Sequence, residues 1–351
     1  MDSSYIGKYG QLRVLSTEFI SVQYMKNMEQ KWDEFMKILS ATPYKAEIDK
    51  FSTLYKMPDL VDVVLNAHMM RTMSNASFAM PSASRAFISA YLSKWDIENI
   101  KLILSSKVLG YSVEQTETFL VVQHDIPVGM FSGMITKEDY KNILAQKDIE
   151  GVVNSLVKYG YGTILMKYFD SAKRSNNVSE MLLALDMHYF ERLIAAYKLH
   201  NSYEGSVGSF IAESIDVKNI TNMLKAYEFG YGGAEAYVIK GGNISEKALV
   251  EALSKGPKAI AEISPFNISN AIAMFEKDHF ISYVEAELKR ELYKKYLGIF
   301  KRSGFSLAFM LYYILRGELE RDELRGIWFS KYYKVSDERY RALQIAPYVL
   351  G

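Results

Sequence analysis

The chain of 351 residues contains no cysteine, which excludes disulfide bonds, thiolate metal ligands and cysteine nucleophiles and fits an intracellular protein. It also has no long hydrophobic run. The longest, Gly304–Leu315, is far shorter than the roughly 20 residues that a membrane-spanning helix needs. Neither sign of charge dominates, because 42 Lys and Arg residues face 41 Asp and Glu residues. We therefore expect a soluble protein with no overall electrostatic preference for nucleic acid or anionic membranes.

Proline is scarce as well, with seven residues in the chain, and sustained alternation of apolar and polar residues is absent. Apolar residues instead recur every three or four positions, which is typical of amphipathic helices. The proportions of 49% apolar and 24% charged residues are those of ordinary core-burying proteins. The sequence therefore predicts an all-α protein that is long enough for two or three domains.

One helical segment occurs twice. The stretch Asp96–Tyr111 (DIENIKLILSSKVLGY) aligns without a gap with Asp216–Tyr231 (DVKNITNMLKAYEFGY), and six of the sixteen positions are identical. Both copies place aliphatic residues on one helical face and open with an acid, which is favourable in the first turn of a helix. Gly110 and Gly230 suit C-terminal caps. Each copy is therefore interpreted as one complete helix.

A second segment recurs. Gly133–Leu144 aligns with Gly242–Leu253, and both contain a Gly, an Ile, a hydroxyl residue and a closing Leu. Thr136 and Asp139 resemble a capping box, so each copy predicts a loop followed by a capped helix. Trp32–Ser40 ends in a similar way and is interpreted as a possible third copy.

The closing leucines of these three segments are 105 and 109 residues apart. This period predicts a third version of the first helix about one unit after Asp216. The segment Glu318–Val335 lies there, with Glu320 and Glu323 at the positions of the Asp and the Asn. We therefore predict three tandem, similar helical bundles, with repeat units at residues 1–128, 129–238 and 239–351.

The polar residues of this repeat are the first candidates for a functional site: Asp96, Asn99, Asp216, Asn219, Glu320 and Glu323. Carboxylates and amides serve in enzymes as metal ligands or as acid and base groups. However, active sites are seldom duplicated in every repeat of one chain, and Asn is a poor residue for a helix interior. We interpret the set as a structural repeat motif in which the Asp caps a helix and the Asn bonds between helices. A helical-repeat enzyme is the alternative.

Other candidates for chemistry are weaker. The five histidines, His68, His124, His188, His200 and His279, lack the spacing of a helical zinc site and are expected to be solvated surface groups. No glycine-rich segment has the Walker pattern. The basic stretch Glu287–Gly304 interleaves both signs of charge, which favours a solvated helix face. That stretch leaves open an adaptor that binds peptides or nucleic acid. No catalytic residue, metal or cofactor is predicted.

Several segments together resemble a known family: Tyr9–Val14, Ser40–Tyr44, Trp95–Gly110, Ile215–Ala226, Val238–Ser245 and Leu307–Tyr333. Each segment alone is a weak signal. Their order, spacing and recurrence over nearly the whole chain are similar to the C subunits of archaeal-type (A-type) and V-type ATP synthases, and to the related d subunit of the vacuolar proton pump.

This resemblance implies a funnel of three similar helical bundles around a pseudo-threefold axis. In that family the funnel lies on the cytoplasmic face of the membrane rotor ring and receives the foot of the central stalk. The resemblance thus implies a non-catalytic socket that transmits torque, with central-stalk subunits (D and F type) and the membrane proteolipid ring as partners. It implies no cofactor, no nucleic acid and no transmembrane segment. The alternative is a helical-repeat adaptor or scaffold unrelated to ATPases.

Overall fold

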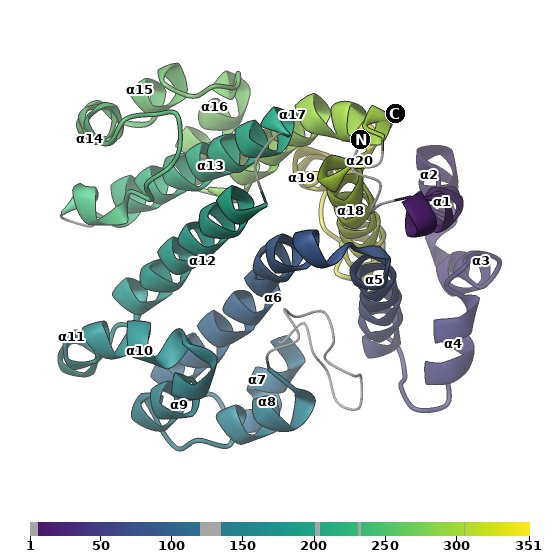
Figure 1. Ribbon diagram of the computed structural model, residues 1–351, viewed down its shortest axis with the longest axis horizontal. Helices are drawn as coiled ribbons and strands as arrows, with labels where there is room; N and C mark the ends of the chain where they lie inside the picture. Colours follow the sequence, from purple (N-terminus) through teal and green to yellow (C-terminus); the bar gives the residue numbers. More distant parts are fainter. Residues whose placement is uncertain (1–5, 120–134, 201–203, 231–232, 305) are drawn as a thin grey trace. The chain divides into compact units, whose positions relative to one another are not determined.

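The computed structural model describes residues 6–119, 135–200, 204–230, 233–304 and 306–351, and within these ranges it contains helices joined by loops and no strand (Figure 1). The predicted all-α class is confirmed. The α-helices are α1 (Ile6–Leu15), α2 (Val22–Gln30), α3 (Phe35–Leu39), α4 (Lys45–Phe51), α5 (Asp59–Ala79), α6 (Ser82–Leu109), α7 (Val113–Phe119), α8 (Lys137–Leu144), α9 (Ile149–Ser155), α10 (Tyr161–Leu165), α11 (Phe169–Ser175), α12 (Ser179–Leu199), α13 (Gly205–Phe229), α14 (Glu246–Lys255), α15 (Pro257–Glu262), α16 (Ser269–Asp278), α17 (Ser282–Arg302), α18 (Leu307–Tyr332), α19 (Asp337–Leu343) and α20 (Ala346–Val349). Short 3₁₀ turns are η2 (Trp32–Glu34), η3 (Val157–Tyr159), η4 (Met166–Tyr168) and η5 (Ala234–Tyr237).

The chain packs into two compact units. The first unit comprises Met1–Met80 and Ser202–Gly351, and the second comprises Pro81–Asn201. These boundaries describe packing and do not coincide with the three repeat units proposed from the sequence pattern. The division into three repeats therefore stays a prediction.

Long helices packed in pairs form the body of each unit. In the first unit α5 lies against α18 and α13 lies against α17, and in the second unit α6 lies against α12 (Figure 1). Every residue of α18 from Leu307 to Arg321 is buried, as expected for a helix that runs through a core. The apolar run of the sequence thus belongs to a core helix. Within the described part of the chain, no helix combines the length and hydrophobicity needed to span a membrane.

Ion pairs connect the helices within each pair: Arg325–Asp62 (2.7 Å) joins α18 to α5, Lys101–Asp186 joins α6 to α12, and Lys225–Glu285 (3.0 Å) and Lys295–Glu213 join α13 to α17. Lys101 and Asp186 are largely buried, whereas the other three lysine and arginine side chains are more exposed. Exposed pairs contribute little free energy, so burial of apolar side chains provides most of the stability and the ion pairs mainly help to set the register.

The helices that carry the repeated polar residues end alike. Gly110 after α6 and Gly230 after α13 adopt left-handed conformations with φ of 70° and 66°, so the predicted C-terminal caps are confirmed. Lys334 follows Glu320 at the same distance and also has a positive φ, of 54°. In both α6 and α18 the next amide bonds a carbonyl five residues back, Tyr111 to Ser106 at 3.0 Å and Val335 to Ser330 at 2.8 Å.

Lys334 therefore occupies a position that favours glycine. A left-handed conformation costs a residue with a Cβ about 1–2 kcal/mol, and glycine avoids this cost. Glycine also makes the unfolded chain more flexible, which lowers the free energy of unfolding by about 0.4–1 kcal/mol and offsets part of the benefit. We expect Lys334→Gly to raise the free energy of unfolding by about 0.5 kcal/mol and Gly110→Ala to lower it by about 1 kcal/mol. A Cβ at Gly110 would meet no atom within 4 Å, so Gly110→Ala tests the effect of the backbone conformation alone. Urea unfolding of both variants checks the pair, and a loss of stability in Lys334→Gly would contradict it.

Candidate functional site

The repeated acid of α18, Glu320, lies in the core of the first unit and is 1% exposed. Its carboxylate accepts hydrogen bonds from the Ile20 amide at 2.6 Å and from the Tyr44 hydroxyl at 3.1 Å. Arg316, one turn earlier, lies 3.4 Å from the same carboxylate and donates to the Ile20 carbonyl. Both backbone groups of Ile20 are thus bound by side chains of α18. This contact attaches the N-terminal segment of the chain to its last long helix.

Burial governs the electrostatics of this cluster. It raises the pKa of Glu320, while the Arg316 guanidinium and the hydrogen bonds to the carboxylate act in the opposite direction. Burial and the neighbouring Glu320 raise the pKa of Tyr44 well above its usual value, so this hydroxyl stays protonated and donates. The Tyr44 ring stacks on His68 with 3.7 Å between the ring centroids.

Two histidines correct the expectation of solvated surface groups. His68 is buried between Tyr44 and Glu47, because α4 and α18 both pack on α5. His188 is half-buried on α12, and burial lowers its pKa to about 4. His124 lies outside the described residues. Among the described residues no group of His, Asp and Glu is arranged to hold a metal ion.

The repeated acid of α13 makes an equivalent contact within the first unit. Asp216 is fully buried and accepts hydrogen bonds from the backbone amides of Asn243 at 3.1 Å and Ile244 at 3.0 Å. The Asn243 side chain adds a third at 3.0 Å. Gly242 lies so close that a Cβ at this position would be 2.2 Å from Asp216 Oδ1. The carboxylate therefore holds the loop that precedes α14.

The repeated acid of α6 lies in the second unit. Asp96 is fully buried and accepts a hydrogen bond from the Tyr140 hydroxyl of α8 at 3.1 Å. Burial and the nearby Asp96 charge raise the pKa of Tyr140 well above its usual value, whereas a hydrogen bond from Asn99 lowers it. The three repeated acids thus bind three different segments, each just before a short helix or in its first residues.

The Asn side chain three residues after the repeated acid also binds a neighbouring segment in the α13 copy. Asn219 accepts from the Ile239 amide at 2.7 Å and donates to the Ile239 carbonyl at 2.9 Å. Asn99 is 1% exposed and lies beside Tyr140. At the third position, Glu323 is 5% exposed and accepts from the Tyr340 hydroxyl at 3.3 Å and from Gln344 Nε2 at 3.0 Å.

The expected position of the acids in a first helical turn is wrong. Asp96 and Asp216 lie in the interior of α6 and α13, because these helices begin earlier, at Ser82 and Gly205. An acid in the helix interior gains nothing from the helix terminus, so its partners are the side chains and amides of the packed segment. The expectation that Asp caps its own helix is corrected accordingly.

The interpretation of Trp32–Ser40 as the third copy of the second segment is also wrong. Ser21, Thr136 and Ser245 each cap a short helix by accepting from the backbone amide three residues later, at 3.2 Å in every case. An isoleucine precedes each of them, and Ile20 and Ile244 are the residues whose amides bind a repeated acid. The segment that aligns with both copies through this isoleucine and hydroxyl residue is therefore Glu18–Glu29. The predicted capping box of Thr136 and Asp139 is confirmed, whereas Gly133 lies outside the described residues.

These contacts show how the sequence repeat relates to the packing. The long helix near the end of the first predicted unit binds the start of the second, through Asp96 and Tyr140, and α13 binds the start of the third through Asp216 and Ile244. The last long helix, α18, binds the start of the first predicted repeat unit through Glu320. Each repeated acid thus holds together segments from two different predicted repeat units.

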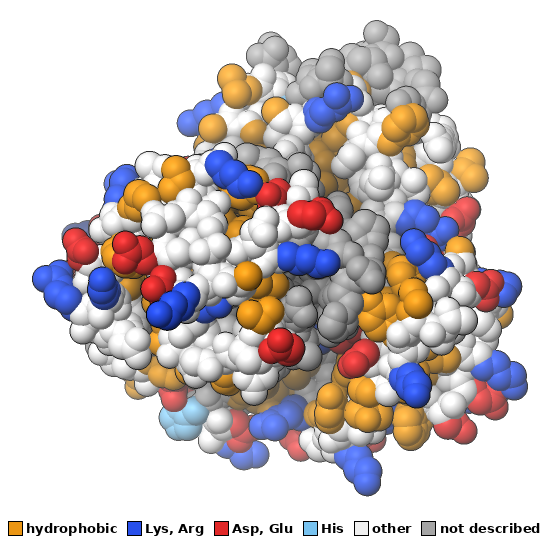
Figure 2. Space-filling view, turned by 90° about the horizontal axis from the view of Figure 1, so that it is seen from below, with side chains coloured by type: hydrophobic (Ala, Val, Ile, Leu, Met, Phe, Trp, Pro, Cys, Tyr) orange, Lys and Arg blue, Asp and Glu red, His pale blue; other side chains and the backbone are white. Residues whose placement is uncertain are grey.

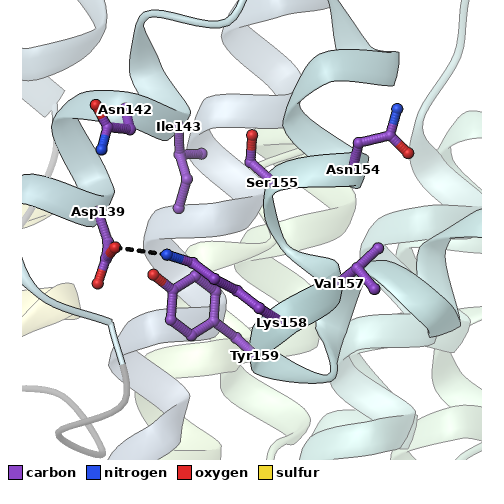
Figure 3. Close-up of a pocket in the computed structure, with 8 residues that line it drawn as sticks. All are labelled: Asp139, Asn142, Ile143, Asn154, Ser155, Val157, Lys158 and Tyr159. Atoms are coloured by element: carbon purple, nitrogen blue, oxygen red, sulfur yellow. Dashed lines mark hydrogen bonds and ion pairs between the residues drawn. The ribbon is translucent and has the colours of Figure 1, made fainter.

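Each repeated acid accepts hydrogen bonds from a different segment of the chain, and these contacts are structural. The helical-repeat enzyme considered above requires them to converge on one pocket. One cavity, of about 410 Å³, contains none of them and is lined by Asp139, Asn142, Ile143, Asn154, Ser155, Val157, Lys158 and Tyr159 (Figure 3). Lys158 reaches across it to Asp139 at 2.8 Å, and Thr136 binds the same carboxylate. The hydrogen bonds from Lys158, Tyr159 and Thr136 lower the pKa of Asp139, so this acid is unsuited to proton transfer near neutral pH.

The basic stretch Glu287–Gly304 forms most of α17 and the two residues that follow it. Lys289, Lys294 and Lys301 are exposed there, but Lys295 pairs with Glu213 and Arg290 pairs with Glu287. This mixture of exposed lysines and ion pairs is typical of a solvated helix face.

Comparison with known proteins identifies the family of this chain. The family described as "ATP synthase (C/AC39) subunit" matches residues 9–343. The C subunit of the A-type ATP synthase of Thermoplasma volcanium is 32% identical over 98% of this chain and 99% of its own length. The corresponding protein of Thermoplasma acidophilum is 34% identical over 94% of this chain and 95% of its own. The one from Methanocaldococcus jannaschii is 24% identical over 90% and 79%. The chain belongs to the ATP synthase (C/AC39) subunit family.

Proposed function

We propose that this chain is a non-catalytic central-rotor subunit of an A-type ATP synthase. It would act as a socket that couples the central stalk, with its D-type and F-type subunits, to the membrane proteolipid ring at the cytoplasmic face. The observation that carries the proposal is the family match over residues 9–343, together with relatives of nearly equal length that are named as C subunits of A-type ATP synthases.

The packing supports a mechanical role. A body that transmits torque must deform little under load, and close-packed protein interiors have low compressibility. The long helices are buried against partners, and the three repeated acids hold segments from different repeat units together. The recurrence of this contact supports a funnel of three similar bundles with pseudo-threefold symmetry, which is part of the proposal.

The surface supports contacts that assemble reversibly. Both signs of charge are interspersed with apolar side chains on the face seen in Figure 2. Polar interfaces of this kind form and dissociate with modest free energies and are weakened by salt. We therefore expect the chain to bind the ring through contacts that weaken as the salt concentration rises.

A purification tests the assignment. A tagged copy is expressed in its host, the membranes are extracted with a mild detergent at low salt, and the proteins that co-purify are identified by mass. We expect a small hydrophobic proteolipid together with central-stalk and headpiece subunits, and loss of these partners at high salt. Recovery of the chain alone, or with partners unrelated to ATPases, would contradict the proposal and favour the adaptor alternative.

A further inference from the structure

The C-terminal residues 336–350 form a strap, made of α19 and α20, that packs on α17 and α18. Arg290 of α17 donates to two strap carbonyls, Ala342 at 3.1 Å and Gln344 at 2.7 Å. Its guanidinium also lies 4.3 Å from the centre of the Tyr348 ring. These contacts attach the outer part of the strap to α17.

Glu323 of α18 provides the second attachment. It is 5% exposed beneath the strap and accepts hydrogen bonds from Tyr340 and Gln344. The equivalent positions of the other two repeats hold neutral amides, Asn99 and Asn219. Only the third copy of the motif therefore places an ionisable side chain at this buried position.

We propose that Glu323 makes the strap an acid-tightened latch: the neutral side chain keeps the strap docked, and ionisation of the carboxyl group favours its release. Covering a carboxylate with the strap removes it from water, and this costs more free energy than covering a neutral acid. Release of the strap exposes Glu323 to water and removes that cost. This inference concerns the isolated chain and does not depend on the proposed rotor function.

The surroundings of Glu323 agree with this direction. The pKa of Glu323 is raised to about 7, chiefly by burial. Glu29 of α2 also raises this pKa, whereas hydrogen bonds from Gln344, Tyr340 and the Ala346 amide lower it. On α17, Arg290 is paired with Glu287 and bound to strap carbonyls. The other charged groups close to Glu323 on α18 have partners of their own: Glu320 pairs with Arg316, Asp322 pairs with Arg321 at 2.8 Å, and Arg325 pairs with Asp62 at 2.7 Å.

The sign of the pH dependence follows from these values. The docked strap holds Glu323 with a pKa of about 7, and a detached strap returns it to its ordinary value of 4.5. Docking is therefore fully favoured below the ordinary value and loses this contribution as the pH rises through 7. Between about pH 5 and pH 8 the equilibrium constant for opening is expected to rise on the order of 50-fold.

Hydrogen exchange of the full-length chain tests the latch. The exchange rates of the strap amides are measured from pH 5 to pH 8 in the natural chain and in Glu323→Gln, and their ratio is taken at each pH. The ratio removes the intrinsic pH dependence of exchange. We expect the ratio of the rate in the natural chain to the rate in Glu323→Gln to rise on the order of 50-fold from pH 5 to pH 8. A ratio that changes less than twofold over this range would overturn the proposal.

Two further variants keep the test decisive. Asp322→Asn neutralises an exposed acid on the same helix. The ratio of the exchange rate in the natural chain to the rate in this variant is expected to stay constant from pH 5 to pH 8. Tyr340→Phe removes one donor to the Glu323 carboxylate, so it should speed exchange of the strap more at pH 8 than at pH 5. An equal effect of Tyr340→Phe at both pH values would count against the latch, even if Glu323→Gln does not fold.

Discussion

Replacement of Glu320 by alanine is expected to lower the free energy of unfolding by about 3–5 kcal/mol, the range found when one partner of a buried ion pair is removed. The change leaves the Arg316 guanidinium buried without its carboxylate, and it removes the acceptor of the Ile20 amide and of the Tyr44 hydroxyl. Each of these groups then bears a desolvation cost. Chemical denaturation followed by circular dichroism measures the effect.

Asp322→Ala is the matched control, because this side chain is 50% exposed on the same helix and pairs only with its neighbour Arg321 in the described contacts. Its expected effect is about 0.5 kcal/mol or less. The double variant Arg316→Met/Glu320→Leu removes both charges and should lose less stability than Glu320→Ala. A loss below about 1 kcal/mol in Glu320→Ala would show that this contact does not hold the two chain ends together.

Gly242→Ala is the second variant with a large expected effect, about 2–4 kcal/mol of lost stability from overpacking and broken hydrogen bonds. The new methyl group would lie 2.2 Å from Asp216 Oδ1, so either the carboxylate or the loop must move. Movement of either one disturbs the hydrogen bonds from Asn243 and Ile244. Thermal and urea unfolding of the variant measure the loss.

Gly205→Ala serves as its control, because a Cβ at that position of α13 would meet no atom within 4 Å and alanine favours the helix. A double variant tests whether Gly242 acts through the Asp216 carboxylate. If the clash with Asp216 is the cause, Gly242→Ala should cost clearly less in an Asp216→Ala background than in the natural chain. Strictly additive losses would show that Gly242 acts through something other than this carboxylate.

The sequence predicts the helical class and the recurrence of the polar residues, because both depend on local patterns. Helical periodicity marks α6, α13 and α18, and glycine marks two of their ends at Gly110 and Gly230. The start of each long helix is harder to predict, since residues such as Ser82–Lys94 contain serines but no helix breaker. An acid placed in a helix interior, as at Asp96, gives no local sign of its tertiary partner.

Partners that lie far apart in the sequence are beyond the reach of local patterns. Ile20 and Glu320 are separated by almost the whole chain, and their contact depends on how the two chain ends pack. Two signals are nevertheless present. Arg316 lies next to an apolar run four residues before Glu320, and an isoleucine followed by a hydroxyl residue occurs at Ile20, Ile135 and Ile244. The closing leucines are less informative, because any amphipathic helix provides them.

Coupling of ATP hydrolysis to ion transport tests the central proposal most directly. Inverted membrane vesicles are prepared from host cells with and without this chain, and ATP hydrolysis and ATP-driven ion uptake are measured on the same preparation. Without the chain, we expect the headpiece to hydrolyse ATP still and the vesicles to take up no ions. Supplying the natural chain again should restore ATP-driven ion uptake. Normal ATP-driven ion uptake in the absence of this chain would contradict a role in torque transmission.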